Sequence, residues 1–76
     1  MSNKEKKQYL YNLLIQLENW RQKIRNNRIA RNSVIEEIDT TISEIEEISK
    51  KKEIPDTEIT SVERKLSFIK QQLMHM

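Results

Sequence analysis

The stretch that decides the fold is residues 26–36, which read NNRIARNSVIE. Before this stretch, apolar residues recur three and four positions apart, which is typical of a helix packed on other helices. They are Leu10, Leu13, Leu17, Trp20 and Ile24, with Tyr9 and Leu14 on the flanks. The pattern loses its phase at Ile29 and Ala30, and the pair Asn26-Asn27 can end a helix. We therefore expect a first helix over about residues 4–27, followed by a break.

The second half of the quoted stretch predicts the start of a new helix. Ser33 and Glu36 have the spacing of a capping box, in which the two residues satisfy free backbone N–H groups of a first helical turn. The apolar residues that follow again form one face: Ile35, Ile38, Ile42 and Ile45, with Val34 and Ile48 at its edges. Acids at the start and Lys50–52 at the end suit the helix dipole. We predict a second helix over about residues 33–52.

Pro55 separates this helix from a third one. A proline disfavours the helical conformation of the residue before it, so the second helix must end by Ile54, and Asp56 or Thr57 can cap the next. The third apolar face consists of Ile59, Val62, Leu66, Ile69 and Leu73. Two short connections make consecutive helices antiparallel neighbours. The sequence thus predicts a single all-α domain, a small antiparallel three-helix bundle with helices at about 4–27, 33–52 and 57–75 and coiled-coil-like packing.

One alternative stays open at this point. The chain has no glycine, and a helix that continues through residues 26–36 needs none. The fold would then be a long helical hairpin of residues 4–53 and 57–75. Because its two arms differ greatly in length, such a hairpin would have to dimerise to cover the surplus.

Composition restricts the chemistry. The 76 residues include no glycine, no cysteine and one histidine, which argues against Gly-rich phosphate loops, disulfides, zinc knuckles and thiol nucleophiles. The acidic residues fall on outward faces, where water surrounds their carboxylates. Catalysis by a carboxylate usually needs a water-poor pocket that changes its acid–base strength. We expect no enzymatic activity, no cofactor and no metal site.

No apolar run reaches the ~20 residues that span a bilayer, so we expect a cytoplasmic protein without membrane contact. Low Gly and Pro content together with abundant Ile, Lys, Asn and Glu is typical of an AT-rich genome, which suggests a bacterial, phage or plasmid source.

Charge is segregated along the chain. Residues 1–32 carry eight bases and two acids, whereas residues 33–49 carry six acids and no base. The candidate basic surface is Arg21, Lys23, Arg25, Arg28 and Arg31, and the candidate acidic surface is Glu36, Asp39, Glu46 and Glu47. We interpret these charges as pairing the first helix with the second. The alternative is a small nucleic-acid-binding accessory protein that uses residues 21–31.

Some apolar residues lie outside the three packing faces. Tyr11 and Ile15, four residues apart, should adjoin each other beside Leu14, and Phe68 falls far from the face of its helix. We interpret these four residues as a surface for a partner or for self-association. The sequence thus favours a small helical protein–protein interaction module that acts as an adaptor, inhibitor or assembly regulator and forms a homodimer.

Overall fold

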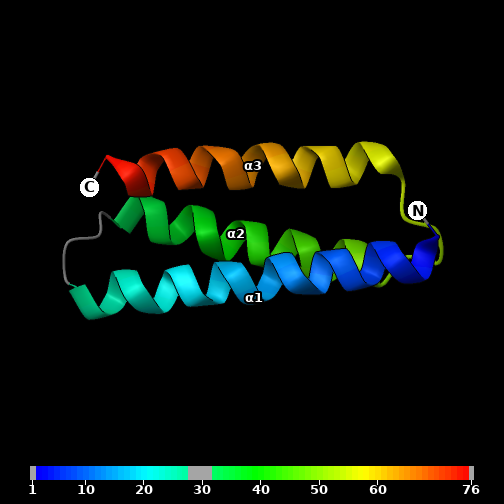
Figure 1. Cartoon of the computed structure of the whole chain (residues 1–76), viewed down its shortest axis with the longest axis horizontal. Coiled ribbons are helices and arrows are strands. Elements are labelled where there is room, and N and C mark those ends of the chain that lie inside the picture. Colours follow the sequence, from blue (N-terminus) through cyan, green and yellow to red (C-terminus); the bar gives the residue numbers. More distant parts are fainter. Residues whose placement is uncertain (1, 28–31, 76) are drawn as a thin grey trace.

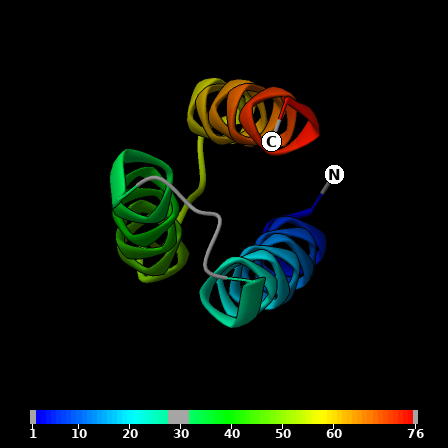
Figure 2. The same ribbon diagram turned by 90° about the vertical axis from the view of Figure 1, so that its left-hand side faces the viewer.

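The computed structural model of the chain describes residues 2–27 and 32–75, which form three helices: α1 (Asn3–Asn27), α2 (Asn32–Ser49) and α3 (Asp56–Met74). Successive helices run in opposite directions along a rod of 39 × 18 × 15 Å (Figure 1). Viewed from its end, the rod has its helices at the corners of a triangle (Figure 2). The predicted antiparallel three-helix bundle is confirmed. The long hairpin is wrong, because α1 and α2 lie side by side and point in opposite directions.

The apolar faces of the three helices meet in one core. Its buried members are Leu10, Leu17, Ile24, Val34, Ile38, Ile42, Ile45, Ile48, Ile54, Ile59, Val62, Leu66 and Ile69. Helix α2 packs against both other helices, whereas the backbones of α1 and α3 approach each other less closely. The middle helix therefore organises the bundle.

The buried face of α2 is rotated from the predicted one. Val34 and Ile48 are fully buried, whereas Ile35 is only half-buried. Thr41 is also buried, and its hydroxyl donates a 2.8 Å hydrogen bond to the carbonyl oxygen of Glu37, which satisfies a polar group inside the core. This difference arises because α2 packs against two other helices. A helix with two neighbours buries a wider part of its surface than a helix that packs along one line of contact.

The ends of α2 differ from the sequence prediction. The helix begins at Asn32, so Ser33 lies within its first turn and is not the N-cap of the expected capping box. It ends at Ser49, before the lysines. The N–H groups of Lys50 and Lys51 donate to the carbonyls of Glu47 (3.2 Å) and Ile48 (3.1 Å), three residues back, which tightens the last turn and stops the helix.

The start of α3 differs in a similar way. Pro55 itself is the N-cap, with an extended backbone, and its carbonyl accepts hydrogen bonds from the N–H groups of Glu58 (3.1 Å) and Ile59 (3.4 Å). Asp56 and Thr57 therefore belong to the first turn, and the prediction that one of them caps the helix is wrong. Asp56 still places a negative charge at the positive end of the helix dipole.

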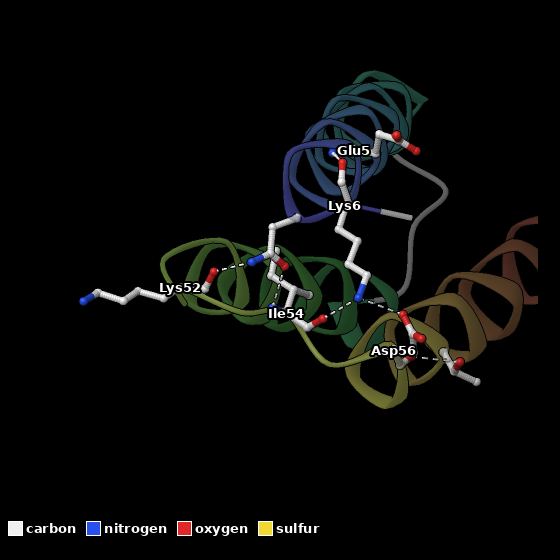
Figure 3. A network of polar contacts seen from close by, with 8 residues as sticks. Glu5, Lys6, Lys52, Ile54 and Asp56 are labelled. Atoms are coloured by element: carbon white, nitrogen blue, oxygen red, sulfur yellow. Dashed lines mark hydrogen bonds and ion pairs between the residues drawn. The ribbon is translucent and has the colours of Figure 1, made fainter.

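The turn between α2 and α3 is held by the first residues of α1. The side-chain oxygen of Asn3 accepts from the Ile54 N–H (3.1 Å), while its amide nitrogen donates to the Lys52 carbonyl. The Lys6 ammonium donates to the Ile54 carbonyl (2.8 Å) and pairs with Asp56 at 2.9 Å (Figure 3). We call these contacts the N-terminal clamp. They surround Ile54, which is only 2% exposed and joins the core from the turn.

The clamp predicts that Asn3→Ala lowers the free energy of unfolding by about 1–2 kcal/mol, since the part-buried Ile54 N–H loses its acceptor. Urea denaturation measures this change. The matched control is Asn12→Ala, because exposed Asn12 bonds to Gln8 within the same helix. Equal stability of the two variants would contradict the assignment.

Candidate protein-interaction surfaces

The first candidate surface is the outer side of α1. Tyr11 is 57% exposed and Ile15 is 41% exposed, as their phase on the helix predicted. Leu14 is half-buried and packs against the core, so it adjoins this pair without being an exposed member of it. We call Tyr11 and Ile15 the outer pair. Their role in binding stays a prediction.

Phe68 is also exposed, to 48%, but it belongs to a different surface. It lies in a groove of about 530 Å³ formed by α2 and α3 alone. The α2 wall of this groove includes Glu36, Glu37 and Thr40, and the α3 wall includes Arg64. The structure therefore does not bring Phe68 together with the outer pair.

A second hollow, of about 490 Å³, continues along the same two helices. The ion pair of Lys51 with Glu58 lies in this second hollow, and Lys65, which lines the first one, pairs with Glu44 of the second. Of these two pairs, only that of Lys65 with Glu44 neutralises an acid of α2, since Glu58 belongs to α3 and Lys51 follows the end of α2. The α2–α3 groove is consequently mixed in charge, but most of the surface that lines it is apolar.

The predicted charged surfaces are partly used inside the fold. The Arg21 guanidinium donates to the Asp39 carboxylate at 2.8 Å, which joins α1 to α2 as the structural interpretation of the charge pattern expected. Such a partly exposed pair contributes about 0–1 kcal/mol. This contact takes one residue from the candidate basic surface and one from the candidate acidic surface.

The other members of these two surfaces have different fates. Lys23, Arg25 and Glu46 are exposed, Glu36 lines the α2–α3 groove, and Glu47 lies 3.6 Å from Lys50. Arg28 and Arg31 lie outside the described residues. Whether the exposed bases contact nucleic acid stays a prediction.

A third surface, which the sequence did not reveal, is a groove of about 200 Å³ between α1 and α3. It is lined by Tyr9, Leu13, Gln16 and Trp20 from α1 and by Glu63, Leu66, Ser67 and Lys70 from α3. The three largest apolar members from α1 are half-buried and rest on the core without being covered by it. Their regular spacing had assigned them to the core, and spacing alone does not tell which seam of a bundle closes less completely.

A hydrogen bond crosses this α1–α3 groove. The Tyr9 hydroxyl donates to a Glu63 carboxylate oxygen at 2.7 Å. This bond, together with desolvation and the negative charge of Glu63, raises the pKa of Tyr9 above its usual 10.0. The phenol therefore stays protonated to higher pH in the folded chain than in the unfolded one.

The Tyr9 contact predicts a loss of stability in alkali. Because the folded pKa of Tyr9 exceeds the unfolded value, its contribution is complete below pH 10.0 and declines as the pH rises through the folded pKa. Chemical denaturation across this pH range should show a steeper decline for the native sequence than for Tyr9→Phe. Glu63→Gln, which removes the carboxylate charge, should flatten the decline similarly. Identical pH profiles for all three proteins would contradict the contact.

Metal-binding clusters, membrane-spanning helices and similarity to known proteins give no further indication of how these surfaces are used. Among residues 2–27 and 32–75, no three His, Asp or Glu side chains gather closely enough to hold a metal ion. Within the same part of the chain, no helix combines the length and the apolar character needed to cross a membrane. Comparisons with protein-family models, curated proteins and solved structures gave no match.

Proposed function

We propose that this protein is a small non-enzymatic module that binds another protein and acts as an adaptor, inhibitor or assembly regulator. The observation that carries the proposal is the set of large apolar side chains left uncovered on so small a bundle. Among residues 2–27 and 32–75, the exposed members are Tyr11, Ile15, Phe68 and Met74. Covering one such half-exposed side chain in an interface stabilises a complex by about 1 kcal/mol, and tyrosine and tryptophan are frequent centres of binding energy.

The titratable groups of the grooves support a binding role over a catalytic one. Within the described residues several of them are engaged in pairs, Lys65 with Glu44, Lys51 with Glu58 and Tyr9 with Glu63, while others, such as Glu36, Arg64 and Lys70, are exposed to solvent. General acid–base catalysis relies on a group whose pKa lies near the working pH. The phenol of Tyr9 is shifted away from that range, which suits a structural hydrogen bond.

Site-specific photo-crosslinking in the native host tests the proposal. A photoreactive residue is placed at position 11, 16 or 68, one for each surface, with exposed Asn19 and Gln71 as control positions. We expect one discrete protein partner from at least one surface, with a crosslinking yield several-fold above that of the controls. Signals no stronger than the controls would overturn the proposal. Recovery of crosslinked RNA or DNA instead would establish the nucleic-acid alternative.

Self-association is part of the same proposal. The outer pair on α1 is the apolar surface available for a homodimer, since burying it adds contact area that a bundle of this size lacks. Tyr11→Ala combined with Ile15→Ala should leave helicity and melting temperature nearly unchanged and shift sedimentation towards monomer. The control is Asn12→Ala combined with Asn19→Ala. A native protein that sediments as a monomer at every concentration would exclude the homodimer and leave partner binding unaffected.

A further inference from the structure

The side of the bundle between α1 and α3 is the one that the topology leaves incomplete. Both helices point in the same direction, and α2, antiparallel to both, lies on the opposite side (Figures 1 and 2). Two polar contacts described above, Lys6 with Asp56 and Tyr9 with Glu63, join α1 to α3 near their N-terminal ends. An up-down-up-down bundle would place a fourth, antiparallel helix along this side.

The α1–α3 groove offers a fourth helix an apolar floor. Tyr9, Leu13 and Trp20 from α1 are half-buried, and Leu66 from α3, a buried core residue, also lines the groove. From Tyr9 to Trp20 the row covers three helical turns, or about 16 Å. A hollow of about 200 Å³ does not hold a helix but accepts the apolar side chains of one that lies along it.

The rims of the groove carry opposite charges at their two ends. On α3, Glu63 and Lys70 both line the groove and are two turns apart, or about 10 Å along the helix. On α1, exposed Glu5 precedes Tyr9 by four residues and exposed Lys23 follows Trp20 by three, so they extend the same row. Lys6 also faces α3 near the start of α1, but its charge is balanced by Asp56. Glu5 and Glu63 therefore leave the groove acidic near the start of α1 and α3, and Lys23 and Lys70 make it basic near their ends.

We propose that the α1–α3 groove binds one helix of a partner protein, antiparallel to α1 and α3, with an acidic N-terminal half and a basic C-terminal half. This inference rests on the proposed function, that the protein binds another protein. In that orientation the acids of the incoming helix meet Lys23 and Lys70, and its bases meet Glu5 and Glu63. Its dipole also opposes those of both neighbouring helices, which is favourable.

A second copy of the chain does not supply this helix. The helix α2 carries acids in both halves and no base, and it buries its apolar face in its own core. The helix α1 has a free apolar pair, but it carries bases at both ends, including Lys4, Lys7 and Arg25. The helix α3 does have acids in its first half and bases in its second half, but its apolar face, Ile59, Val62, Leu66 and Ile69, is buried in its own core. Because none of the three helices combines this charge order with a free apolar face, the partner is a different protein.

The only tryptophan of the chain, Trp20, reports occupancy of the groove. The probe is a synthetic helical peptide of about five turns with leucines on one face, glutamates in its first half and lysines in its second half. The comparison peptide has the two halves exchanged. We expect saturable binding of the first peptide, with a blue shift of Trp20 emission and protection from acrylamide, and binding of the exchanged peptide at least about tenfold weaker, ~1.4 kcal/mol.

Charge variants test the orientation. Lys23→Glu combined with Lys70→Glu should weaken binding of the first peptide and strengthen binding of the exchanged peptide, because the basic end of the groove becomes acidic. Arg25→Glu combined with Arg64→Glu makes the same change of charge elsewhere and should preserve the preference. Circular dichroism verifies the fold of each variant.

Three results would overturn the inference: no saturable binding of either peptide, equal affinity for both peptides, or an equal effect of the two double variants. These results are distinguishable from failure of the proposed function. Crosslinks of a partner protein from position 11 or 68 but not from position 16 would retain the binding function and exclude this groove.

Discussion

The architecture depends on how the chain turns at Ile54 and Pro55. No glycine is available for a left-handed turn residue, so the reversal is made by a proline with its ordinary backbone angle and by a buried isoleucine. The backbone of Ile54 would lose its hydrogen bonds to water on burial. Asn3 and Lys6 replace those bonds. The start of α1 and the start of α3 are therefore held at the same end of the bundle. The parallel arrangement of α1 and α3, and hence the groove between them, follows from this junction.

Much of this fold could be predicted because three helical faces repeat at the same spacing and Pro55 interrupts the chain unambiguously. The errors share one physical origin, since local patterns do not show how a helix is shared between two neighbours. Val34 is buried and Ile35 only half-buried because α2 serves both seams. Ser33 has the spacing of a cap but lies within the helix. The clamp could not be foreseen, because it joins residues about fifty positions apart.

The candidate sites were predictable to different degrees. The exposure of Tyr11, Ile15 and Phe68 follows from helical phase alone, and the structure agrees. That Phe68 lies on another surface from the outer pair requires the positions of all three helices. Trp20 shows the limit most clearly, since its spacing correctly places it against the core but not at a seam that stays partly open. Periodicity identifies which side chains turn inward, and tertiary packing determines which of them are fully covered.

The N-terminal clamp also bears on the order in which the molecule assembles. A short turn separates α2 from α3, so their contacts close small loops of chain at a low cost in conformational entropy. The bond between Asn3 and Ile54 spans 51 residues and closes a far larger loop. We therefore expect the clamp to form after the contacts between helices that are adjacent in the sequence. During synthesis on the ribosome, the contacts of Asn3 and Lys6 with Ile54 cannot form until the turn at Ile54 has been synthesised.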